Sequence, residues 1–86
     1  MDEFVECLRA LPLGYSTGLH NDRRYGATID LSPDGKRMKL FAEELGGNDH
    51  VSFNLYFTAG GKPVLKTCEM PQEKVIDFVL NYAPDG

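Results

Sequence analysis

The chain has 86 residues, and its hydrophobic fraction of 42% and charged fraction of 26% are those of a folded protein. This length allows one domain, residues 1–86, with one modest core, and the composition excludes a disordered chain. The formal net charge of −4 argues against charge-driven binding to nucleic acid or to anionic membranes.

The first predicted element is a helix that begins near Asp2. Its apolar residues Phe4, Leu8 and Leu11 recur at helical spacing, and Asp2 can cap the first turn. Pro12 ends the helix, because a proline disfavours helical conformation at the residue before it. We therefore predict a short amphipathic helix that turns one face toward the core.

Two strands joined by a tight turn are predicted next. Residues 15–20 alternate, and Asn21 and Asp22 tolerate the positive φ that a two-residue hairpin turn requires. The second strand covers residues 23–31 and alternates in the same way. Four of its residues are predicted to face inward: Tyr25, Ala27, Ile29 and Leu31.

The third and fourth strands carry the clearest patterns. Residues 32–35 form a strong turn signal, and the third strand follows over residues 36–43. Residues 50–58 show the cleanest alternation in the chain and predict the central strand of the sheet. The inward residues of these two strands are Met38, Leu40, Ala42, Val51, Phe53, Leu55 and Phe57.

The last predicted elements are a short strand and a helix. Pro63 marks residues 63–68 as an edge strand, and Pro71 suits the first position of a helix that runs to Tyr82. Short turns between neighbouring strands force antiparallel pairing. The predicted fold class is α+β: a helix, a four- to five-stranded antiparallel β-meander and a second helix, with both helices on one face of the sheet.

The opposite face of the sheet is the predicted binding surface. Residues 20–40 are mildly basic, with five cations and three anions in an otherwise acidic chain. An open sheet face that combines aromatic and basic side chains suits a docked peptide or stacked bases. A solvated face with local cross-strand pairs is the alternative. The predicted binding residues are Arg24, Arg37, Lys39, Phe41, Asn54 and Tyr56.

Cys68 is a weak candidate for a catalytic residue. It precedes a helix N-terminus, whose dipole favours a thiolate, whereas Glu69 beside it acts in the other direction. Free cysteines are usually buried, so we expect Cys68 to lie in the core and to react slowly with thiol reagents. His20 and His50 show no metal-ligand spacing, so we expect them to be solvated or capping, with no metal site and no cofactor.

Five segments form a set: Gly14-Tyr15-Ser16-Thr17-Gly18, Arg23-Arg24-Tyr25-Gly26, Glu44-Leu45-Gly46-Gly47-Asn48-Asp49, Ser52-Phe53-Asn54-Leu55-Tyr56 and Lys66-Thr67-Cys68-Glu69-Met70-Pro71. Together they resemble a family of short bacterial proteins of about this length, over nearly the whole chain. The resemblance implies a small autonomous bacterial domain without a defined activity. Some members carry a methionine sulfoxide reductase label, but that chemistry in its best-known form uses a Gly-Cys-Phe-Trp nucleophile. Here the comparable segment is Thr67-Cys68-Glu69-Met70, and the chain has no tryptophan.

A second resemblance concerns topology only. The order helix, antiparallel strands, helix is similar to that of double-stranded-RNA-binding domains, which place a lysine cluster at the start of the last helix. The matching segment here, Pro71-Gln72-Glu73-Lys74, has one lysine beside a glutamate. This difference disfavours binding to double-stranded nucleic acid.

We therefore expect a non-catalytic interaction module that binds an unknown protein or a small acidic ligand through the outer sheet face or a sheet edge. A homodimer through a sheet edge is another expected use of such an edge. Two other function classes stay open: a thiol-dependent redox enzyme centred on Cys68, similar to methionine sulfoxide reductase, and a weak binder of single-stranded nucleic acid. The acidic N-terminus and the lack of a long apolar run predict a cytoplasmic protein without a membrane partner.

Overall fold

The alternating segments of the chain pair in sequence order into one antiparallel sheet, as the computed structural model of residues 2–85 shows. Six strands lie in the order β5-β4-β3-β2-β1-β6, and two helices accompany them. The predicted α+β class is confirmed. The elements are α1 (Asp2–Ala10), β1 (Gly14–His20), β2 (Arg23–Leu31), β3 (Arg37–Glu44), β4 (His50–Phe57), β5 (Pro63–Thr67), α2 (Gln72–Asn81) and β6 (Ala83–Pro84).

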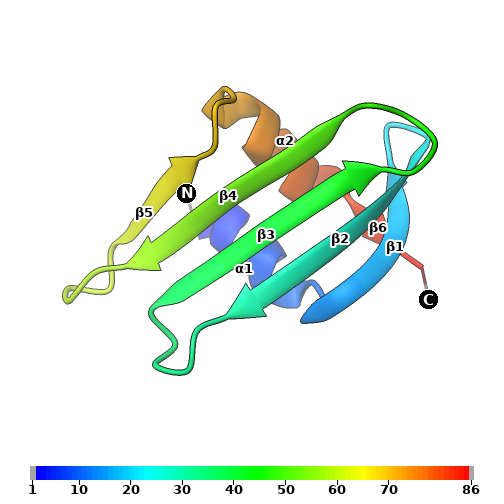
Figure 1. Cartoon of the computed structure of the whole chain (residues 1–86). Coiled ribbons are helices and arrows are strands. Elements are labelled where there is room, and N and C mark those ends of the chain that lie inside the picture. Colours follow the sequence, from blue (N-terminus) through cyan, green and yellow to red (C-terminus); the bar gives the residue numbers. More distant parts are fainter. Residues whose placement is uncertain (1, 86) are drawn as a thin grey trace.

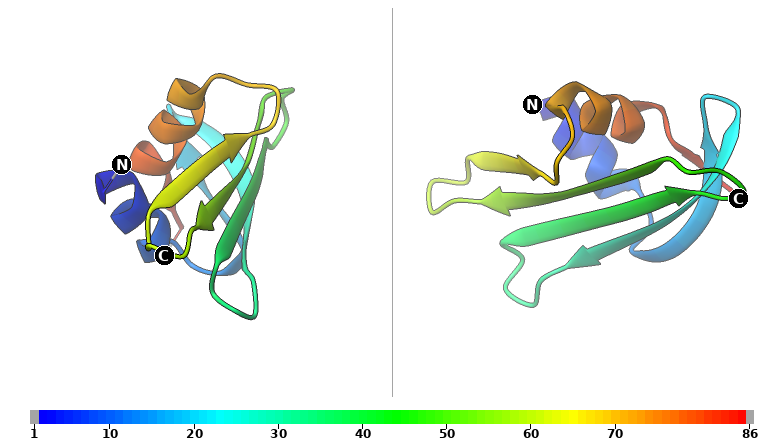
Figure 2. Two further views of the ribbon diagram at one scale, coloured as in Figure 1. Left: turned by 90° about the vertical axis from the view of Figure 1, so that its left-hand side faces the viewer. Right: turned by 45° about the horizontal axis from the view of Figure 1, so that its top comes forward.

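Both helices lie on the same face of the sheet (Figure 1), and the edge-on view of Figure 2 shows the resulting two layers. The core fills the space between them, and the predicted inward residues of β3 and β4 contribute to it, with Phe57 only half-buried. Phe53 is fully buried, and its ring centroid lies 5.6 Å from that of Phe4 on α1. The buried apolar residues are Phe4, Leu8, Leu11, Tyr25, Ala27, Ile29, Met38, Leu40, Ala42, Val51, Phe53, Leu55, Val75, Phe78, Val79 and Tyr82.

The tight turns occur where the sequence predicts them. Asn21 and Asp22 join β1 to β2 with φ values of 52° and 65°, as a two-residue hairpin turn requires. Between β2 and β3, Gly35 has a φ of 74° and donates its N–H to the carbonyl of Ser32 at 2.9 Å. These turns set the register of the sheet and thereby decide which side chains face the helices.

Three details differ from the sequence prediction. Leu31, expected to face the core, is exposed, because it is the last residue of β2 and lies at the rim of the helix-covered layer. Pro71 precedes α2 in extended conformation, with φ −63° and ψ 146°, so the helix begins at Gln72. The strand β6 was not predicted. It pairs with β1 through Gly18 and Leu19, and the Asp85 N–H extends this pairing to the carbonyl of Thr17 at 2.9 Å.

Candidate functional site

The predicted binding residues lie on the outer face, by which we mean the face of the sheet opposite α1 and α2. No helix of residues 2–85 covers this face (Figure 2). Strand register arranges its side chains in rows across the sheet, in which neighbouring side chains are close enough to contact. Four of these rows are Thr17-Gly26-Glu43-His50, Tyr15-Thr28-Phe41-Ser52, Asp30-Lys39-Asn54-Lys66 and Arg37-Tyr56-Val64.

Three aromatic rings remain accessible on the outer face. Tyr15 is 65% exposed, Phe41 is 43% exposed and Tyr56 is 40% exposed. The Tyr15 ring lies across Gly26, where a Cβ atom would collide with it, so the absence of a side chain at Gly26 makes room for this ring. Phe41 and Tyr56 belong to adjacent strands, and the row that contains Lys39 and Asn54 lies between them, so a partner that contacts both rings also covers this row.

Five of the six predicted binding residues gather on β3 and β4, but Arg24 does not join them. Its guanidinium binds Asp85 with two hydrogen bonds, the shorter of 2.8 Å, and Asp85 also accepts a hydrogen bond from Thr17. This pairing raises the pKa of Arg24 and lowers the pKa of Asp85. Arg24 therefore holds the C-terminal segment on the sheet. The free cations of the surface are Arg37, Lys39 and, as an addition to the predicted set, Lys66, for each of which no ion pair is formed within residues 2–85.

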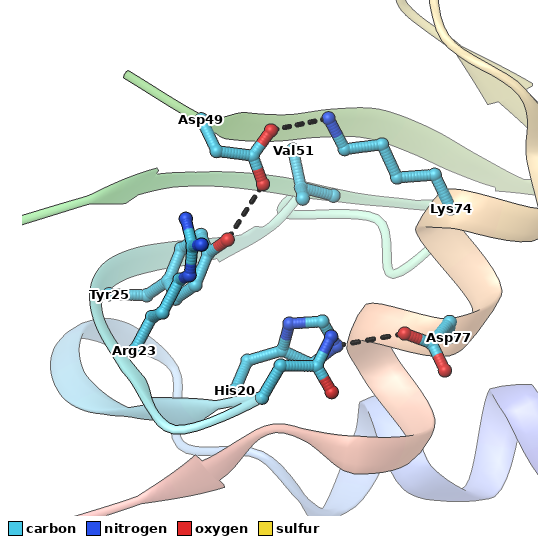
Figure 3. Close-up of a pocket in the computed structure, with 8 residues that line it drawn as sticks. His20, Arg23, Tyr25, Asp49, Val51, Lys74 and Asp77 are labelled. Atoms are coloured by element: carbon cyan, nitrogen blue, oxygen red, sulfur yellow. Dashed lines mark hydrogen bonds and ion pairs between the residues drawn. The ribbon is translucent and has the colours of Figure 1, made fainter. Parts of the chain in front are cut away.

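The structure also contains a polar hollow of about 430 Å³ on the helix side, between the β1–β2 turn, the start of β4 and α2 (Figure 3). Sequence reasoning missed it, because its residues come together only when α2 packs on the sheet. Its lining is balanced in charge, with two cations and two carboxylates. The lining residues are His20, Asn21, Arg23, Tyr25, Asp49, Val51, Lys74 and Asp77.

Asp49 is the centre of one hydrogen-bonded group in the polar hollow. Its carboxylate accepts a hydrogen bond from the Tyr25 hydroxyl at 2.6 Å and another from the Lys74 ammonium at 2.5 Å (Figure 3). The Lys74 bond, followed by the Tyr25 bond, lowers the pKa of Asp49. Burial raises the pKa of Tyr25, and its bond to Asp49 raises it further, so Tyr25 stays a protonated donor at neutral pH.

His20 forms the second group of the polar hollow and corrects the prediction of a solvated or capping histidine. It is only 7% exposed, its Nε2 lies 3.0 Å from the Asp77 carboxylate, and its ring packs 5.0 Å from that of Phe78. Its buried Nδ1 has no hydrogen-bond partner within residues 2–85. The inward position of His20 follows from the predicted turn. A two-residue turn at 21–22 pairs Gly18 with Tyr25, so an inward Tyr25 places Gly18 and His20 on the inner face as well.

The chemistry of the polar hollow is that of a clamp between helix and sheet. Lys74 and Asp77 belong to α2, and each pairs with a residue of the sheet or of the loop before β4. Each carboxylate therefore already has partners, and the residues that line the hollow with His20 include no serine, threonine or cysteine. Within residues 2–85, no group of three His, Cys, Asp or Glu side chains could hold a metal ion. We therefore interpret the polar hollow as a structural contact that orients α2.

Cys68 lies on the opposite side from the core, so the expectation of a buried thiol is wrong. It continues β5 by donating its N–H to the Ser52 carbonyl at 3.2 Å, and its side chain is exposed. The physical reason is strand alternation: Lys66 faces outward, so Cys68, two residues later, does so too. Cys7 packs against the core on the helix side, and the two thiols are free.

No family model, curated protein or solved structure matches this chain. The resemblance to short bacterial proteins therefore stays a prediction, and the functional argument rests on the geometry of the surface. Neither helix of residues 2–85 is long and apolar enough to cross a bilayer.

Asp49→Asn is expected to change how stability depends on pH. Because the folded-state pKa of Asp49 is lowered, its contribution is complete above the unfolded value of about 3.9 and is lost as the pH falls through the folded-state pKa. The difference in unfolding free energy between wild type and variant should therefore narrow as the pH falls below the unfolded value and through the lowered folded-state pKa. Urea unfolding at each pH measures it. The pKa values of Asp34 and Asp85 are also lowered, but both residues are present in both proteins, so their contributions cancel in the difference. If the difference in unfolding free energy did not change with pH, the contribution of the Asp49 carboxylate to the clamp would be contradicted.

Cys68 is expected to react rapidly with a thiol reagent in the native protein, because it is exposed. Cys7 should react slowly until denaturant is added, since it is partly buried against the core. Absorbance after addition of an aromatic disulfide reagent should show one fast thiol and one slow thiol. Cys68→Ser should abolish the fast phase alone. A fast phase that survives this substitution would show that Cys68 is not the accessible thiol.

Proposed function

We propose that this chain is a non-catalytic binding module that docks an acidic segment of another protein on its outer face. The observation that carries the proposal is the exposure of Phe41 and Tyr56 on adjacent strands of an uncovered sheet face. Aromatic anchors contribute a disproportionate share of binding energy at protein interfaces. An uncovered face with two such rings on neighbouring strands is therefore suited to a partner.

Electrostatics support an acidic partner. The cations Arg37, Lys39 and Lys66 surround Tyr56 on the outer face, and the anion in their rows is Asp30, opposite Lys39. The protein as a whole has a net charge of −4, so this basic area stands out from its surroundings. Complementary charge steers encounter and fixes orientation more than it adds affinity. Binding should weaken as salt rises, because exposed charges are screened.

The other ligand classes have less support. A small acidic ligand needs a hollow, but the hollow beside Phe41 is bordered by Glu43 and Glu44, whose charges repel an anion. Single-stranded nucleic acid could stack on the rings, yet the net charge of the chain is −4. A thiol-dependent redox enzyme needs a site around Cys68, and Cys68 does not line the polar hollow. A homodimer through a sheet edge would use β5, which has a neighbouring strand on one side only within residues 2–85.

Replacing both Phe41 and Tyr56 by serine is expected to weaken capture of the partner at least about tenfold, because both anchors are lost. The free energy of unfolding should change by only about 1 kcal/mol, since both residues are exposed and lie outside the core. Quantitative pull-down and thermal unfolding measure the two effects.

The matched control for this double variant replaces Leu13 and Leu31 by serine. These two residues are also exposed and apolar, but they border a hollow with Arg9 and Phe57 on the helix side of the molecule. Capture should be unchanged in the control. Equal loss of capture in both variants would contradict a role of the outer face. A Phe41 and Tyr56 variant that is unfolded at the temperature of the pull-down would show that this face is already covered in the folded protein.

A further inference from the structure

The two edges of the sheet differ in whether they can accept another strand. The edge at β1 is occupied over residues 17–19, because β6 pairs with Gly18 and Leu19 and the Asp85 N–H bonds the Thr17 carbonyl. The edge at β5 has no neighbouring strand within residues 2–85. An unpaired edge strand presents a row of free N–H and C=O groups and is a template for pairing with another chain.

The free groups of β5 can be assigned from its pairing with β4. The Lys62 carbonyl accepts from the Thr58 N–H, and the Cys68 N–H donates to the Ser52 carbonyl, so the even-numbered residues bond β4. Because the bonding direction alternates along an antiparallel strand, Leu65 and Thr67 direct their backbone groups to the open edge. Pro63 also directs its backbone groups to the open edge. Its missing N–H therefore removes no hydrogen bond between β5 and β4.

Charge makes the two sides of this edge different. On the outer side, Lys66 shares a row with Lys39 and Asn54, so a side chain added beside Lys66 meets cations. On the helix side, a hollow of about 400 Å³ beside Pro63 is lined by Val5 and Phe57 and is also bordered by two acids and one cation, Asp2, Glu6 and Arg9. An added strand is therefore favoured when its acidic residues face outward and its apolar residues face the helices.

We propose that β5 pairs with an extended segment of the partner, which becomes a seventh strand antiparallel to β5 and alternates acidic with apolar residues. This inference rests on the proposed function and specifies it further. The acidic side chains lie beside Lys66 on the outer face, and the apolar side chains lie beside Leu65 and the hollow at Pro63. Backbone hydrogen bonds to Leu65 and Thr67 supply affinity, and the alternating side chains supply specificity.

A second copy of this chain fits the edge less well than such a segment. Pairing of β5 with its own copy around Leu65 sets Thr67 opposite Pro63, which has no N–H to donate. The same pairing places the two Lys66 side chains in diagonal positions on one face, where like charges repel each other. An acidic segment has no lysine to repel Lys66, and it meets one Pro63 instead of the two that face each other's partner strand in the homodimer.

The test uses a fluorescent seven-residue peptide that alternates glutamate and valine, and measures its binding by fluorescence anisotropy. In the proposed geometry the valine residues lie opposite Leu65 and Thr67 and exchange hydrogen bonds with them. N-methylation of the valine residues should therefore weaken binding by at least about tenfold, because donors are lost and a methyl group enters the interface. N-methylation of the glutamate residues, whose N–H groups point away from β5, should change binding less than about threefold.

Two protein variants complete the test. Lys66→Glu should weaken binding of the unmodified peptide about tenfold, whereas Lys62→Glu, in the β4–β5 turn, should have a much smaller effect. Equal loss from both N-methylated peptides would overturn strand addition, yet leave the proposed function intact if the Phe41 and Tyr56 variant still loses binding. A concentration-dependent dimer that excludes the peptide would overturn the inference in favour of a second copy. Failure of the unmodified peptide to bind at millimolar concentration would also overturn it.

Discussion

Phe53→Ala is expected to lower the free energy of unfolding by about 3–5 kcal/mol, as is typical when a buried phenylalanine is truncated and a cavity is left. Phe53 is fully buried at the middle of β4 and packs against Phe4 of α1. This loss is a large share of the stability of a domain of this size. Urea-induced unfolding followed by circular dichroism measures the change.

Phe41→Ala is the matched control for this substitution. Phe41 has the same side chain and lies on the neighbouring strand β3, but it points to the outer face and is 43% exposed. Its truncation should cost about 1 kcal/mol or less. If Phe41→Ala cost more than Phe53→Ala, the two faces of the sheet would have been assigned the wrong way round.

Gly18→Val is expected to destabilise the protein by about 1–3 kcal/mol, because a side chain at this position has no room. A Cβ atom there would collide with the Ala83 carbonyl and would lie 2.8 Å from the Pro84 Cα atom. The expected response is that β6 moves away from β1. Hydrogen exchange should then show faster exchange of the Asp85 amide, which bonds the Thr17 carbonyl in the wild type.

Gly60→Ala is the control for the glycine substitution. Gly60 lies in the β4–β5 turn, and a Cβ atom there would meet nothing within 4 Å. Its φ is not in the left-handed region, so alanine fits the backbone. Stability should stay the same or rise slightly. A Gly18→Val protein as stable as wild type would contradict the close packing of β6.

The sheet could be predicted because its information is local. Period-2 alternation in residues 36–43 and 50–58 correctly divided the side chains between the core and the outer face. The turn at Asn21 and Asp22 was readable because few residues tolerate two successive positive φ values. The positions of Phe41 and Tyr56 followed directly from these two signals.

The polar hollow and β6 could not be predicted in the same way, because they depend on contacts between distant parts of the chain. The hollow needs Asp49 to meet Lys74 and His20 to meet Asp77 across the core. The strand β6 has only two residues, Ala83 and Pro84, and therefore carries no alternation. Cys68 was misplaced for a different reason: a general preference of cysteine for burial was given more weight than the outward position of Lys66 two residues earlier.

An amide NMR titration with the alternating glutamate–valine peptide tests whether the outer face and the β5 edge form the binding surface. The largest shift changes are expected at Leu65 and Thr67 on β5, with smaller changes at Lys39 and Tyr56 on the outer face. The amides of His20, Asp49 and Lys74, at the polar hollow, should stay unchanged because these residues belong neither to β5 nor to the outer face. Shift changes confined to the polar hollow, with β5 and the outer face unaffected, would contradict the proposed binding surface.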